Sequence, residues 1–160
     1  MRRLALFAVC LAPAIAQSTE ELKKHWATSK EFTLAVANAM PEAYYGFKPA
    51  HQEWSFGQTI GFIAGVNGYY CSSVVGETSP IQGPLRGDKA SAIKVLTKSF
   101  DYCAEVVSRL GPADLEKPRT EQQLTVRELL WSGFTSIAHH RAQLEVYLKL
   151  KGIKPPDYRF

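Results

Sequence analysis

Residues 125–152 read TVRELLWSGFTSIAHHRAQLEVYLKLKG, and this stretch decides the fold. Thr125 and Glu128 have the spacing of a capping box, in which two side chains satisfy the first free backbone N–H groups of a helix. Gly152 is placed as a C-terminal capping glycine. The sequence therefore predicts one long helix ending near Lys151. Its inward stripe, at intervals of three and four residues, is Val126, Leu130, Gly133, Ile137, His140, Leu144 and Tyr147.

Two other helices are delimited by capping and breaking residues. The first begins at residues 18–21, which again have capping-box form, and ends before Pro41, because a residue that precedes proline disfavours helical geometry. The third begins after Asp88 as its N-cap and ends before Gly111 and Pro112. Both segments carry apolar residues at helical spacing.

The second helix begins at Ser55, with Gln58 completing another capping box. Residues 55–76 contain no charged side chain, which raises the alternative of a membrane span. Polar residues such as Asn67 interrupt the stretch, so we interpret it as a central helix buried on most sides. Four helices without a strand signal predict an all-α fold, a four-helix bundle.

The two cysteines of the bundle bear on its topology. The loop from about Gly76 to Asp88 is long enough to return along a whole helix, so the second and third helices can run parallel. Cys71 and Cys103 then lie at the same height, whereas an antiparallel pair would hold them too far apart to bridge. The sequence favours a crossover with a Cys71–Cys103 disulfide, and two buried free thiols remain the alternative.

The first 16 residues have the order of a secretory signal peptide. Met1–Arg3 is a basic start, Leu4–Leu11 is apolar, and Ala14–Ala16 has the small-x-small pattern of a cleavage site. We expect residues 1–16 to be removed and residues 17–160 to form one bundle domain in the periplasm or outside the cell. Disulfides persist in such compartments.

Two other readings of this terminus stay open, a lipid-modified Cys10 and an uncleaved anchor. Cleavage after Ala16 leaves 17 basic against 15 acidic side chains, so the formal net charge falls from +4 to +2. The chain has no basic run with interleaved aromatic residues. We therefore expect no nucleic-acid partner and, after cleavage, no stable membrane span.

Two separated segments resemble the DinB-like family of small helical metalloenzymes. Residues 40–49, MPEAYYGFKP, followed by residues 55–58, SFGQ, and Gly61, are similar to the family's loop and second-helix start. Residues 140–156, HRAQLEVYLKLKGIKPP, are similar to its last helix. The resemblance implies a four-helix bundle of up-down-down-up topology, in agreement with the parallel pair inferred from the cysteines.

The resemblance also implies a metal site of three histidines, one on the second helix and two on the fourth. Carried onto this chain, the three positions are Phe62, Ser136 and His140, so His140 is the only ligand retained. Phenylalanine cannot bind a metal, and a neutral serine hydroxyl is a poor ligand for zinc or nickel. His139 points about 100° away from His140 around the helix, so it does not replace either of the missing ligands.

We expect His140 to face a small polar pocket, for which we predict the lining Phe62, Asn67, Ser136, His140 and Gln143. Ser136 and His140 lie one turn apart and are able to form a Ser–His pair, but no orienting acid is evident. No catalytic residue is assigned. We expect no cofactor, with zinc or nickel as the alternative.

Three functions follow. The first is a metal-free protein that binds a small, largely apolar molecule in a vestigial enzyme-like bundle. The second is the divalent-metal-dependent enzyme that the resemblance implies, of thiol-transferase or hydrolase type. The third is a structural or interaction module that forms a homodimer. The degraded triad favours the first.

Overall fold

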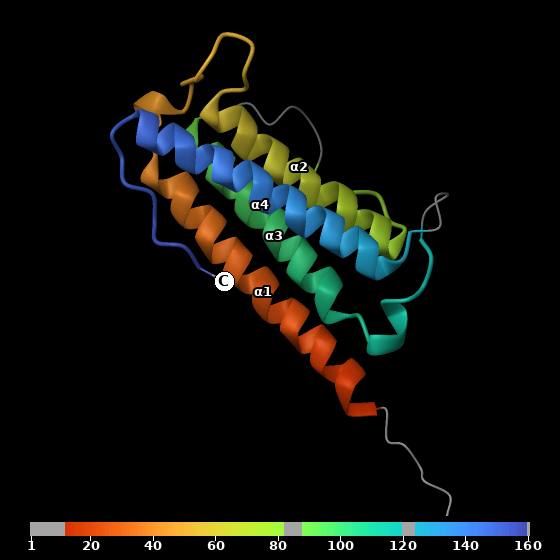
Figure 1. Cartoon of the computed structure of the whole chain (residues 1–160). Helices are drawn as coiled ribbons and strands as arrows, with labels where there is room; N and C mark the ends of the chain where they lie inside the picture. Colours follow the sequence, from red (N-terminus) through yellow and green to blue (C-terminus); the bar gives the residue numbers. More distant parts are fainter. Residues whose placement is uncertain (1–11, 82–87, 120–123, 160) are drawn as a thin grey trace, which may run out of the picture.

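The computed structural model describes residues 12–81, 88–119 and 124–159 (Figure 1). Those residues contain no strand, only an isolated bridge between Pro118 and Thr125, so the all-α prediction is confirmed. Four long helices and two short 3₁₀ helices make up the chain in the order α1 (Ala12–Ala39), η1 (Glu42–Tyr44), α2 (Phe56–Val75), α3 (Lys89–Ser108), η2 (Pro112–Asp114) and α4 (Val126–Leu150).

Helices α2 and α3 run parallel, as the cysteines predicted. Cys71 and Cys103 form a disulfide with their Cα atoms 5.4 Å apart, across a sequence separation of 32. One turn earlier on both helices, Asn67 Nδ2 donates to Ser99 Oγ at 3.0 Å, again across 32 residues. A constant separation is the mark of a parallel pair, because both chains then advance in the same direction.

Helices α1 and α4 run in the opposite direction to α2 and α3 (Figure 1). Along the α2–α4 contact, Phe62 lies against His140, and eight residues further along α2 Tyr70 lies against Gly133, so the order of contacts reverses. Each helix packs on two neighbours, α1 and α2 both lying between α3 and α4. The topology is therefore up-down-down-up.

The predicted caps of three helices are present. Ser55 and Gln58 form the capping box of α2, Thr125 and Glu128 form that of α4, and Asp88 accepts a hydrogen bond from the backbone N–H of the third residue of α3. The first helix differs from expectation, since α1 begins at Ala12 and continues through residues 18–21. Alanine-rich sequence has the highest helix propensity, which accounts for the earlier start.

The crossover that joins α2 to α3 leaves α2 at Gly76, whose φ of +72° suits glycine at a helix C-terminus. Its first part then lies over Gly68. A Cβ atom built at Gly68 would approach Ser79 Oγ to 2.5 Å and Ile81 Cβ to 2.9 Å. Glycine at position 68 thus lets the crossover pack directly on the helix.

The core confirms that α2 is a central helix, because it buries residues toward both α3 and α4. In the described part of the chain, no helix is long and apolar enough to cross a bilayer. Residues 1–11 of the predicted signal peptide lie outside the described residues, and residues 12–16 form the start of α1. Cleavage after Ala16 stays a prediction.

Candidate functional site

Two aromatic rings, those of Phe62 and Trp54, lie against the one retained histidine at the surface between α2 and α4. The ring centroids of Phe62 and His140 lie 4.6 Å apart, and Trp54, just before α2, lies 4.7 Å from Phe62 and 6.2 Å from His140. Phe62 is 38% exposed and His140 is partly exposed. The structure thus brings Phe62 and His140 together as predicted, but in a surface cluster rather than inside the bundle.

Gln143 joins His140 to its neighbour His139. Gln143 Oε1 lies 2.8 Å from His140 Nδ1, and Gln143 Nε2 lies 3.2 Å from His139 Nε2. With the amide in this orientation, its oxygen accepts from a protonated Nδ1 of His140 and its nitrogen donates to an unprotonated Nε2 of His139. The two imidazoles, expected to point apart, are linked by one amide that holds the tautomer of each.

Ser136 does not form the Ser–His pair that its spacing allowed. It lies on α4 one turn before His140 and is partly buried, but no hydrogen bond joins it to His140 in the described structure. His140 Nδ1 is bound to Gln143 instead. A nucleophilic serine requires a hydrogen-bonded base, so this geometry does not support nucleophilic catalysis.

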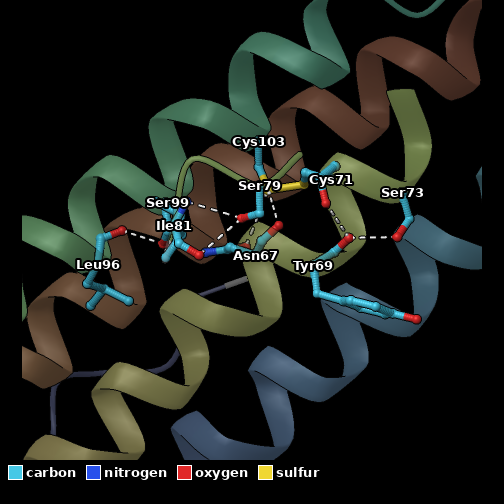
Figure 2. The surroundings of a disulfide bond; sticks show 10 residues. Asn67, Tyr69, Cys71, Ser73, Ser79, Ile81, Leu96, Ser99 and Cys103 are labelled. Carbon is cyan, nitrogen blue, oxygen red and sulfur yellow. Dashed lines mark hydrogen bonds between the residues drawn. A yellow bond between two sulfur atoms is a disulfide. The ribbon is translucent and has the colours of Figure 1, made fainter. Parts of the chain in front are cut away.

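Asn67 lies away from this cluster. It follows Phe62 by five residues, which at about 100° per residue turns its side chain roughly 140° around the helix. Figure 2 shows it at the α2–α3 contact, beside the disulfide, where it is fully buried, donates to Ser99 and has its backbone oxygen 3.3 Å from Cys103 Sγ. Asn67 therefore has a structural role that stabilises the parallel pair, and the predicted pocket loses this member.

A cavity of about 260 Å³ lies on another face, between the start of α4 and the N-terminal part of α1. Its wall is mostly apolar, with charged groups at Glu21 and Arg127, and Arg127 is held by Glu116. The full lining is Glu21, Leu22, His25, Leu115, Arg127, Leu130, Trp131 and Phe134. An apolar cavity with a few polar groups has the character of a small-molecule site.

A smaller cavity of about 70 Å³ continues along the same groove and shares His25 and Phe134 with the larger one. Arg141 lines it from α4, and the C-terminal segment covers it, since Tyr158 and Arg159 belong to its wall. Figure 1 shows this segment returning alongside α1. The two cavities therefore lie along one groove between α1 and α4.

The comparisons with known proteins agree with this architecture. The family model described as the DinB superfamily matches residues 21–144, most of the chain. The chain belongs to the DinB superfamily. A DinB-like protein from Bacillus subtilis has a similar solved structure, with a TM-score of 0.73 at 18% identity over 86% of this chain and 96% of that one.

A second DinB-like protein, from Bacillus cereus, also gives a TM-score of 0.73 at 18% identity, covering 88% of this chain and 97% of that chain. A search of proteins with curated functions found no match. Identities this low show a shared fold, and with the family model they confirm the DinB-like assignment. They do not show the chemistry of the site, which depends on the residues present in this chain.

The residues at the DinB metal positions do not fit a metal ion. Phe62 places an aromatic ring 4.6 Å from the imidazole of His140, where a neighbouring ligand would have to coordinate. Ser136 supplies only a neutral hydroxyl. Within the described ranges, no group of three or more His, Cys, Asp or Glu side chains is arranged to hold a metal.

Sequence reasoning missed three features of this DinB-like chain. Trp54 covers the retained histidine from the loop, and its place before the Ser55 cap gave no sign of that contact. Arg141 is buried although arginine usually faces solvent. The α1–α4 cavities depend on a helix spacing that periodicity does not report. The one available signal for Arg141 was its spacing, four residues after Ile137 and three before Leu144, both in the predicted inward stripe.

Proposed function

We propose that this protein is an exported DinB-like bundle that has lost its metal site and binds a small, largely apolar molecule without a metal. The observation that carries the proposal is the contact of Phe62 with His140 and Trp54. One imidazole among aromatic rings has neither the charge nor the donors to hold a divalent cation.

The larger α1–α4 cavity supports the binding part of the proposal. Its volume of about 260 Å³ and its wall of leucine, phenylalanine and tryptophan suit an apolar molecule of modest size. Glu21, which lines it, comes five residues after the predicted cleavage site at Ala16, so the cavity wall belongs to the mature chain. The molecule would lie on the opposite side of α4 from the former metal positions.

The binding part is tested with 1-decanol, an uncharged apolar probe, by calorimetry on residues 17–160. Leu22→Trp places an indole in the cavity and should weaken decanol binding at least tenfold, because the volume is filled. Leu34→Trp makes the same substitution three turns along α1 at a residue that does not line the cavity, and should leave binding unchanged. No decanol binding, or equal binding by both variants, would overturn the proposal.

The metal part is tested by zinc titration. Phe62→His with Ser136→His adds the two missing imidazoles, and this double variant should bind zinc far more tightly than the wild type. The close approach of residues 62 and 140 already shows that the helices lie near enough. Tight binding by the wild type, unchanged in the double variant, would instead favour the metal-dependent enzyme.

Export is supported by the signal-like order of residues 1–16 and by the disulfide, which is stable in an oxidising compartment. An intact mass of periplasmic protein should correspond to a chain that begins at Gln17. A mass that retains Met1 would contradict cleavage.

A homodimer is the second candidate function. Val146 and Leu150, one turn apart on α4, are 51% and 58% exposed. Apolar exposure of this kind favours a protein contact. Sedimentation equilibrium decides it: a dimeric mass that becomes monomeric in Val146→Glu supports the candidate, and a monomeric wild type excludes it.

A further inference from the structure

Arg141 is a buried cation that has no counter-charge in contact among the residues that the structure describes. The residue is 7% exposed and lies on α4 against α1. Its guanidinium packs over the ring of Phe32, with a distance of 4.5 Å to the ring centroid. Burial of a charge is costly unless an opposite charge or several hydrogen bonds compensate it. The hydrogen bonds and charged neighbours of Arg141 therefore decide how much of the cost of burying its charge is offset.

The hydrogen bonds of Arg141 are few and neutral. One terminal nitrogen donates to Ser29 Oγ at 3.2 Å and to Thr33 Oγ1 at 3.3 Å, both long bonds to hydroxyls of α1. A guanidinium carries five N–H donors in a planar fork, and it cannot lose its proton in a protein. Most of its N–H donors thus have no acceptor among the described side chains, and the residue borders a cavity.

Two of the charged residues that border the cavity with Arg141 already have other partners. Arg159 pairs with Glu31 at 3.3 Å, and His25 faces Glu21 at 3.8 Å. Glu145, one turn further along α4, interacts with Arg141 electrostatically but forms no ion pair with it. Among the described residues, Arg141 therefore has no anion in contact, which suits a ligand with a single negative charge.

We propose that the α1–α4 groove binds an amphipathic monocarboxylate, with its carboxylate on Arg141 and its alkyl chain in the larger cavity. The inference rests on the proposed function and names the ligand class. A carboxylate matches the planar guanidinium fork and fits a cavity of about 70 Å³. Ser29, whose hydroxyl accepts from Arg141, and Thr28, whose hydroxyl donates to the backbone oxygen of Lys24, border the same cavity.

The length of the alkyl chain follows from α4. Trp131, at the far wall of the larger cavity, precedes Arg141 by ten residues, or about 15 Å along the helix axis. His25 and Phe134 border both cavities, so the chain would pass between them from the head group to the apolar end. A medium-length saturated chain such as that of decanoate suits this span.

Calorimetry with decanoate, 1-decanol, acetate and decyl phosphate tests the inference on the mature protein. Decanoate should bind roughly 10–100-fold more tightly than decanol, because charge-assisted hydrogen bonds add to the same apolar contact. Acetate should bind far more weakly than either, because it lacks the chain. Decanol binding as tightly as decanoate would overturn the carboxylate assignment and leave the proposed function standing. Tightest binding of decyl phosphate would also overturn it. Failure of both decanol and decanoate would reject the inference and the proposed function together.

Arg141→Gln removes the charge and keeps a hydrogen-bonding side chain. It should weaken decanoate binding at least tenfold and change decanol binding by less than about twofold. Arg109→Gln changes an exposed arginine at the C-cap of α3 that pairs with Glu105; it is the matched control and should change neither affinity. Equal decanoate affinities of the Arg141 and Arg109 variants would refute the role of Arg141. If Arg141→Gln does not fold, the wild-type comparison of decanoate with decanol decides.

Discussion

Reduction of the Cys71–Cys103 bridge should destabilise the bundle without unfolding it. Both cysteines are fully buried, and the residues around them, including Asn67 and Ser99, hold α2 and α3 parallel by other contacts. The reduced thiols would still fill the same space, so the native packing has no new cavity. The bridge acts mainly on the unfolded chain, whose freedom it restricts.

The magnitude follows from the loop that the bridge closes. A separation of 32 residues corresponds to about 3–4 kcal/mol of lost entropy in the unfolded chain on the loop-closure model. For a domain near 150 residues, that free energy corresponds to a fall in Tm of roughly 10 °C. Release of the loop also lets the unfolded chain expose more surface, so the urea m-value should rise on reduction.

The assay is equilibrium urea unfolding of residues 17–160 with and without dithiothreitol. Because neither sulfur is exposed, the protein is unfolded in reductant first and then refolded across the urea series. Cys71→Ala with Cys103→Ala is the control: its unfolding curve should not depend on reductant. A loss of stability below about 1 kcal/mol on reduction, or a reductant effect on the double variant, would refute the reasoning.

Three further predictions concern stability. Ser99→Ala should cost about 1–3 kcal/mol in urea unfolding, since it leaves the buried amide of Asn67 without its acceptor. Asn67→Ala removes the same bond, although Ser99 Oγ still donates to the backbone oxygen of Leu96, and a double-mutant cycle that finds no coupling would contradict the contact. Gly68→Ala should lower the free energy of unfolding, because the added Cβ would meet the crossover. Gly65→Ala has open space around its Cβ and should raise that free energy by about 0.5–1 kcal/mol. A change of the same sign in both variants would be inconsistent with this packing. Burial, with Glu42 adding to it, raises the pKa of the Tyr45 phenol in the folded protein. As the pH rises above about 10, the unfolded chain therefore loses this proton before the folded chain does, and the free energy of unfolding should fall. The fall should be less steep in Tyr45→Phe.

The fold was largely predictable because its signals are local. Capping boxes at Ser55 and Thr125 mark helix starts that the structure reproduces. Cys71 and Cys103 lie nearly equally far from the starts of their helices, which predicted that the long loop between these helices is a crossover joining a parallel pair. The disulfide confirms this prediction. These arguments use only spacing along the chain and the fixed rise of a helix.

The candidate site was less predictable because it depends on which faces of two helices meet. Helical spacing placed His140 in the buried stripe, but α4 packs between α1 and α2 and buries Arg141 while leaving His140 partly exposed. Asn67 was assigned to the pocket by residue type, although its direction on α2 carries it to α3. Trp54 reaches the cluster from a loop, where no periodicity applies.

Elemental analysis of the mature protein, purified without chelators or affinity metals, tests the central claim most directly. The contact of Phe62 with His140 predicts well under one zinc, nickel or manganese ion per ten chains. The Phe62→His, Ser136→His variant, prepared in parallel, should approach one metal ion per chain. A wild-type protein that already carries about one ion per chain would contradict the loss of the metal site.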